Sequence, residues 1–75
     1  MSVDELKAKG NAAFSSGNFK EALEAFSAAI GVDPNNHVLY SNRSGAYAAM
    51  QDFENAKKDA ELCIEKKNDW FKGYS

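Results

Sequence analysis

The sequence is short and poor in the residues that build disulfide frameworks, metal sites and membrane spans. It has 75 residues, with one cysteine, one histidine and one proline. Cys63 alone cannot form an internal disulfide, and no His/Cys cluster has the spacing of metal ligands. No apolar run approaches the length that spans a bilayer, and the first ten residues lack the apolar core of a secretory signal. We therefore expect one soluble, cytoplasmic domain without metal or cofactor.

The charge balance and the side-chain inventory argue against nucleic-acid binders and enzymes. Eleven acidic and nine basic residues give a net charge of −2, whereas a protein that binds a phosphate backbone is normally basic overall. His37 and Cys63 lie on different predicted helices, so no base stands beside a nucleophile in the sequence. We interpret Cys63 as a thiol of the packed interior and His37 as a solvated helix end. The sequence predicts a domain that is not an enzyme.

What the sequence has instead is a helical periodicity that repeats along the chain. Apolar residues from Phe19 to Ile30 recur at spacings of three and four, which is typical of one face of a helix. A second stripe runs from Phe53 to Ile64. The two stripes match at a constant offset of 34 positions, in the pairs Phe19/Phe53, Ala22/Ala56, Phe26/Ala60, Ala29/Cys63 and Ile30/Ile64. A 34-residue period built from two helices is typical of tetratricopeptide repeats.

The segments before these stripes repeat with the same period, and small residues mark where paired helices must approach closely. The matching residues are Leu6, Gly10 and Ala13 in one segment and Tyr40, Ser44 and Tyr47 in the other. We predict helices near 3–16, 19–32, 37–50 and 53–66, and a fifth that begins near 69–70. Asn18 and Asp52 are the expected N-caps, and Pro34 should stop the helix before it.

The predicted fold class is all-α. It consists of tetratricopeptide helical repeats, with two antiparallel helix pairs and the start of a fifth helix, as a piece of a right-handed superhelix. We expect a single truncated domain over 1–75, with repeat one at 3–36, repeat two at 37–70 and the start of repeat three at 71–75. A plain four-helix bundle is the alternative, but it does not require an offset of 34 at so many sites.

A polar patch is predicted on the first helix of each repeat, which lines the concave face of helical repeat arrays. Lys7 and Asn11 are one turn apart and point the same way. Asn42 occupies the equivalent face in repeat two and Lys72 in repeat three. Ammonium and amide donors that converge suit a carboxylate, above all a chain end with its extra carboxylate. Asn42 is the most informative, because an amide in the middle of a helix has a propensity cost and no cap role.

Three further residues, Phe14, Gly45 and Ala48, share this face and should form an apolar hollow beside the charges. The alternative is that Lys7 and Lys72 are ordinary solubilising lysines.

The stretches "ELKAKGNAAF", "NHVLYSNRSGAY" and "DWFKGYS" resemble the first tetratricopeptide module of the Hsp70–Hsp90 organising co-chaperones, a family of stress-inducible adaptors. The resemblance covers essentially the whole chain. It implies a carboxylate clamp that grips the C-terminal Glu-Glu-Val-Asp of the 70-kDa heat-shock chaperone, with the 90-kDa chaperone as a close competitor. The clamp residues that it implies are Lys7, Asn11, Asn42 and Lys72. Arg43 stands where these repeats usually have leucine, and we expect its stem to pack while its guanidinium finds a neighbouring acid.

The family's fifth clamp residue, an arginine, would fall just after Ser75, as would the rest of the third repeat and a capping helix. Phe71, Tyr74 and the stripe behind the fourth helix would then face water. We therefore expect a truncated fragment that self-associates as a homo-oligomer, by swapping helices or by docking its last helix on a second copy. The alternatives to the clamp function are a self-associating fragment with an incomplete clamp and a module from a chaperone-associated enzyme.

Overall fold

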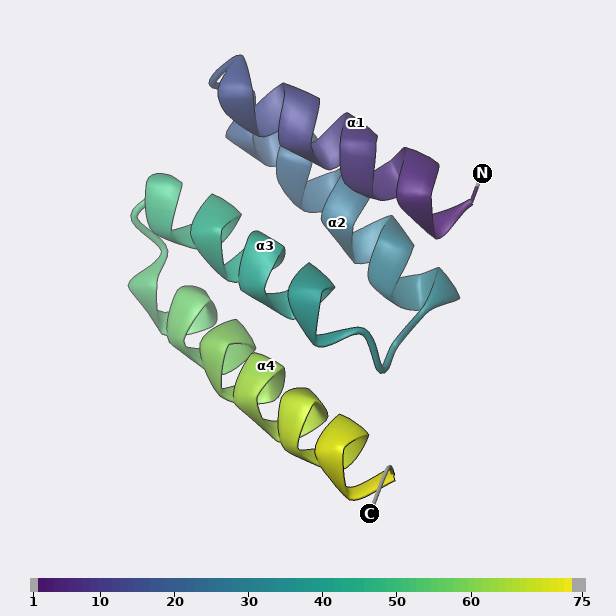
Figure 1. The fold of residues 1–75 in the computed structure, drawn as a ribbon. Helices are drawn as coiled ribbons and strands as arrows, with labels where there is room; N and C mark the ends of the chain where they lie inside the picture. The colour runs from purple at the N-terminus through teal and green to yellow at the C-terminus, as the bar shows by residue number, and fades with distance from the viewer. Residues whose placement is uncertain (1, 74–75) are drawn as a thin grey trace.

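Successive helices lie side by side along the chain, so that α1 and α4 form the two outer edges (Figure 1). The computed structural model describes the backbone of residues 2–73 and the side chains of residues 2–68. The helices are α1 (Val3–Ser15), α2 (Phe19–Val32), α3 (His37–Ala49) and α4 (Phe53–Gly73). Contacts join α1 to α2, α2 to α3 and α3 to α4. The all-α fold class is confirmed, and the described residues contain no strand.

Side chains cap three of the four helices at their N-termini. Ser2 and Asn36 accept backbone N–H bonds at the starts of α1 and α3. Asp52 does the same for α4, where its Oδ1 accepts from the backbone N–H of Asn55 at 3.4 Å, as the sequence predicts. The predicted cap at Asn18 is wrong, since its side chain makes no cap hydrogen bond. The reason is its ψ of 70°, which departs from the extended backbone that a capping side chain needs.

The turns within the two helix pairs have the same backbone geometry. Gly17 and Gln51 stand 34 positions apart and both have positive φ, 82° and 63°. In each turn the next residue donates its backbone N–H to the carbonyl five positions back, at 2.8 and 2.9 Å. This is the hydrogen bond of a Schellman motif, which ends a helix through one residue in the left-handed region. The 34-residue repeat seen in the sequence is therefore also present in the backbone conformation of the turns.

Close approach of α1 and α2 buries Phe26, one of the two largest fully buried side chains among the described residues. Phe26 is 1% exposed and lies directly against Gly10, where an added Cβ would be 2.5 Å from the phenyl ring. The ring and its neighbours in α1 and α3, Ala13 and Ala46, form one core cluster with Ala22. The small residue predicted at Gly10 is confirmed, because no side chain fits between the helix and the ring.

The fourth helix departs from the prediction. α4 runs from Phe53 to Gly73 without a break, so the separate fifth helix predicted near 69–70 is wrong. Repeat two has Asn68 at the position of Pro34 in repeat one. Unlike proline, asparagine keeps its backbone N–H and does not clash with the preceding turn, so nothing stops the helix there.

The two faces of α4 differ in burial. Ala56 and Asp59 are buried against α3, whereas Phe53 and Ile64 are 66% and 62% exposed. The expectation that the stripe behind the fourth helix faces water is confirmed for these two residues and is wrong for Ala56. Cys63 is only half-buried, so its assignment to the interior holds in part. The side chains of the other residues expected to face water, Phe71 and Tyr74, lie outside the described residues.

Candidate functional site

One hollow of about 190 Å³ is formed by the first three helices. Its lining residues are Asn11 and Phe14 from α1, Phe26 from α2, and Ser41, Asn42 and Gly45 from α3. Four of the predicted site residues are therefore brought to one place from helices that are distant in sequence.

The polar side of the hollow consists of two asparagine amides. Asn11 is exposed and Asn42 is half-buried, and Ser41 adds a hydroxyl next to them. Neither amide takes part in any side-chain hydrogen bond found among residues 2–68. Each amide group offers two N–H donors and a carbonyl acceptor. The site can thus donate several hydrogen bonds to a guest without breaking a bond within the chain.

The apolar side of the hollow is built around an exposed aromatic ring. Phe14 is 39% exposed, yet its ring is held edge-on against Phe19 with the ring centroids 5.3 Å apart. Phe26 forms the buried end of the wall. Gly45 lies opposite, where an added Cβ would be 3.9 Å from Cε2 of Phe14. The wall is apolar and fixed, with open space where α3 lacks a side chain.

Not all of the predicted residues line the hollow. Lys7 is half-buried on α1, one turn before Asn11, and does not reach the lining. Ala48 is exposed on α3 and also lies outside it. The side chain of Lys72 lies outside the described residues.

Two lining residues were missed by the sequence reasoning. Ser41 stands four positions before Gly45, so the same i, i+4 rule that pairs Lys7 with Asn11 would have found it. Phe26 was assigned to packing from its place in an apolar stripe. Its ring reaches the hollow only because α1 passes so close at Gly10, and the stripe carries no signal for that.

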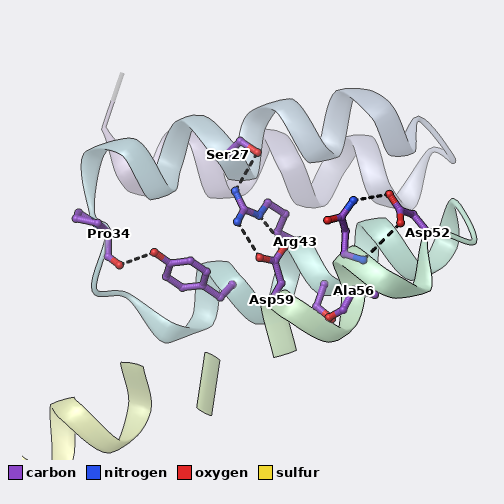
Figure 2. Close-up of polar contacts among 9 residues, drawn as sticks. Ser27, Pro34, Arg43, Asp52, Ala56 and Asp59 are labelled. Atoms are coloured by element: carbon purple, nitrogen blue, oxygen red, sulfur yellow. Dashed lines mark hydrogen bonds and ion pairs between the residues drawn. The ribbon is translucent and has the colours of Figure 1, made fainter. Parts of the chain in front are cut away.

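The orientation of α3 is set by Arg43, whose guanidinium joins three helices (Figure 2). Its Nε and Nη2 each donate to a carboxylate oxygen of Asp59 on α4 at 2.7 Å, and Nη1 donates to Oγ of Ser27 on α2 at 3.4 Å. Asp59 is 3% exposed, and the guanidinium carbon lies 5.7 Å from the ring centroid of Tyr40. The hydrogen bond to Asp59 raises the pKa of Arg43 above its ordinary value and outweighs burial, which lowers it. The expected neighbouring acid is therefore confirmed as Asp59.

Two further hydrogen bonds fix the packing face of α3. The hydroxyl of Tyr40 donates to the carbonyl of Pro34 at 2.7 Å, and the hydroxyl of Ser44 donates to the carbonyl of Ala56 on α4 at 2.7 Å (Figure 2). These bonds hold α3 at its start and near its middle. Asn42 is left to line the hollow on a helix whose orientation is fixed by its neighbours.

Among residues 2–68, no group of three or more His, Cys, Asp and Glu side chains could hold a metal ion. In the same part of the chain no helix combines the length and the apolar character that crossing a membrane requires. Five glutamates on the helices are exposed: Glu21, Glu24, Glu54, Glu61 and Glu65.

The comparisons with known proteins agree on one family for this chain. The tetratricopeptide repeat family matches residues 3–36 and again residues 38–68. The chain is 57% identical to the Heat shock protein sti1 homolog of Schizosaccharomyces pombe and 60% identical to the Hsp70-Hsp90 organizing protein of Triticum aestivum, over 97% of its length in each case. It is 43% identical to Heat shock protein STI1 of Saccharomyces cerevisiae over its full length.

The matched region spans 12% and 13% of the length of the first two relatives, so it corresponds to one part of much longer proteins. Repeat proteins of this class present concave surfaces for binding, and this chain has a hollow lined by α1, α2 and α3. The chain belongs to the tetratricopeptide repeat family, and it is a tetratricopeptide module of the Hsp70–Hsp90 organising co-chaperone family.

Proposed function

We propose that the hollow binds the free C-terminal carboxylate of a peptide ending in Glu-Glu-Val-Asp, the terminus of the 70-kDa heat-shock chaperone. The observation that carries the proposal is the pair of amides from Asn11 and Asn42. They come from different helices, line the same hollow and have no hydrogen-bond partner among the described residues. A carboxylate is the guest that uses several N–H donors at once, because each of its oxygens accepts more than one bond.

The terminal aspartate of this peptide has two carboxylates, which suits a site with several donors and nearby cations. Lys7 lies one turn from Asn11 on the same face of α1 and is the cation on that side. We propose Lys72 as the second cation; its backbone lies in the last turn of α4, and its side chain lies outside the described residues. The whole chain is slightly acidic, so the attraction depends on this local patch and should weaken with added salt.

The one apolar side chain of the peptide, its valine, would occupy the apolar side of the hollow. Phe14 and Gly45 would contact it, with Ala48 at the outer edge. Burying an apolar side chain beside a carboxylate site adds affinity and also restricts which chain ends are accepted.

The choice of partner rests on family likeness. The relative from Triticum aestivum is named for organising Hsp70 and Hsp90, and the resemblance of this chain to a first module favours the 70-kDa chaperone. The 90-kDa chaperone is the competing partner. We place the interaction in the cytoplasm, as part of a stress response.

Titration of a Glu-Glu-Val-Asp peptide by calorimetry tests the proposal, with the same peptide amidated at its C-terminus as the first control. Amidation removes the charged acceptor and should abolish measurable binding. Asn42→Ala removes charge-assisted hydrogen bonds, which contribute about 1.5–3 kcal/mol each, so affinity should fall roughly ten- to a hundred-fold. Asn35→Ala makes the same change at an exposed residue that does not line the hollow, and it should bind like the parent chain. Equal binding of the free and amidated peptides would refute the carboxylate site.

A second candidate function, self-association, is favoured by the outer face of α4. Phe53 and Ile64 are both mostly exposed there. Lys57 and Lys58 precede Glu61 and Glu65 along the helix, so an antiparallel second copy would set unlike charges opposite each other. Light scattering across a range of concentrations tests this. A mass that stays that of one chain at every concentration would exclude it.

A further inference from the structure

Gly45 is an unfavourable residue at its position within α3. Glycine in a helix interior is less favourable than alanine, because it loses more backbone freedom on folding. Its backbone is helical, so no left-handed conformation requires glycine there. An added Cβ would lie in ordinary contact distance of Phe14, at 3.9 Å, so no clash requires glycine either.

Gly10 shows what a glycine required by packing looks like in this chain. There an added Cβ would fall 2.5 Å from the buried ring of Phe26. Gly45 has no such neighbour and lies on the wall of the hollow. The absence of a side chain at Gly45 therefore leaves open volume beside Phe14.

The volume is large for a site that takes a small side chain. An apolar cavity of about 150 Å³ binds a benzene molecule. The hollow beside Gly45 measures about 190 Å³, and its apolar wall includes Phe14 and Phe26. That space is shared by the terminal carboxylate, next to Asn11 and Asn42, and by the side chain that precedes it, next to Phe14 and Gly45.

We propose that Gly45 sets the depth of the apolar subsite and that this subsite accepts side chains larger than valine before the terminal residue. The inference rests on the carboxylate-binding function proposed above, and it adds the substrate class: chain ends in which a large apolar residue precedes a terminal aspartate. In Glu-Glu-Val-Asp the other three side chains are charged, so only the residue before the last can fill an apolar hollow that adjoins Asn11 and Asn42.

The parent chain should rank peptides by the size of this side chain. Leucine adds one CH₂ to valine, and burying it should tighten binding about fourfold. We therefore expect Glu-Glu-Leu-Asp to bind about fourfold more tightly than Glu-Glu-Val-Asp, and Glu-Glu-Ala-Asp to bind more weakly than either.

The experiment measures the dissociation constants of the alanine, valine, leucine and phenylalanine peptides on the parent chain and on Gly45→Ala. The variant should lose the preference for leucine over valine and bind the phenylalanine peptide at least tenfold more weakly than the parent does, while its affinity for the alanine peptide stays within twofold. Its melting temperature should equal or exceed that of the parent, because alanine favours the helix. Gly31→Ala is the matched control. It lies within α2, its added Cβ meets nothing within 4 Å, and it should leave the ranking unchanged.

Two results would overturn the inference: an unchanged ranking of the four peptides on Gly45→Ala, or an equal loss of affinity for all four. Amidated versions of the same peptides keep the two proposals apart. If they bind as well as the free acids, the carboxylate site is refuted, and the ranking still reports on the depth of the subsite. A chain that binds none of the peptides refutes both proposals.

Discussion

The buried ion pair between Arg43 and Asp59 gives a stability prediction that differs from the one that the repeat pattern gives. Arg43→Leu introduces the residue type that these repeats usually have at this position. Judged by the repeat pattern alone, this substitution should not lower the free energy of unfolding. The structure predicts the opposite. Asp59 is 3% exposed, and both of its oxygens accept hydrogen bonds of 2.7 Å from the guanidinium. Removing the arginine leaves a buried carboxylate without its partner.

Breaking a buried pair in this way costs about 3–5 kcal/mol. A chain of 75 residues has a total free energy of unfolding of about 4–11 kcal/mol, at the usual 0.05–0.15 kcal/mol per residue. The loss is therefore a large share of the total. For a domain of this size each kcal/mol shifts the melting temperature by about 4–8 °C, so a decrease of at least about 12 °C is expected.

Thermal unfolding followed by circular dichroism at pH 7 measures this effect. The pKa of Arg43 is raised above its ordinary value, chiefly by the hydrogen bond to Asp59. Arg43 is therefore charged at pH 7, and the stability that its raised pKa contributes is lost only in alkaline solution, as the pH rises through the raised value.

Two further variants separate the buried pair from general effects of substitution. The double variant Arg43→Leu/Asp59→Leu removes both charges and should recover most of the loss, because an apolar pair of similar volume can replace a buried ion pair without penalty. Lys58→Ala breaks the exposed pair with Glu54, whose atoms are 3.8 Å apart, and should change the free energy of unfolding by no more than about 0.5 kcal/mol. If Arg43→Leu melts within 3 °C of the parent, or if the double variant is no more stable than Arg43→Leu, the reasoning is wrong.

Two other predictions concern glycine and the backbone, and both are measured by thermal or urea unfolding. Gly10→Ala forces a methyl group into the ring of Phe26 and should destabilise the chain by about 1–3 kcal/mol, whereas Gly31→Ala, with open space around it, should stabilise it by about 0.5–1 kcal/mol. Equal effects at the two sites would contradict the packing described here. Gln51 has a φ of 63°, which is unfavourable for a residue with a Cβ, so Gln51→Gly should stabilise the chain by up to about 1 kcal/mol. Gly17→Ala in the equivalent turn should destabilise it. A loss of stability in Gln51→Gly would show that the turn is not strained.

The local features of the fold were predictable because they depend on neighbours in the sequence. The spacing of apolar residues identifies helices, Pro34 ends α2, and Asp52 caps α4 with a carboxylate three residues from its donor. The end of α4 was not predicted, since nothing near Asn68 forces a helix to stop or to continue. Where local preferences are weak, the sequence leaves the boundary undecided.

The candidate site was predictable in part, for a similar reason. Helical periodicity gives the direction in which each side chain leaves its own helix, so Asn11, Phe14, Asn42 and Gly45 could be assigned to one face. It does not give the distance between two helices. Lys7 and Ala48 point toward the same side but lie outside the hollow.

By itself, the sequence determined the 34-residue period, the all-α fold and which residues of α1 and α3 share one face. Only the tertiary structure decided that Asp59, sixteen positions from Arg43, is its partner, and that Phe26 reaches the hollow past Gly10. The physical reason is that periodicity is a property of one helix, whereas partners and volumes depend on how closely and at what angle two helices pack.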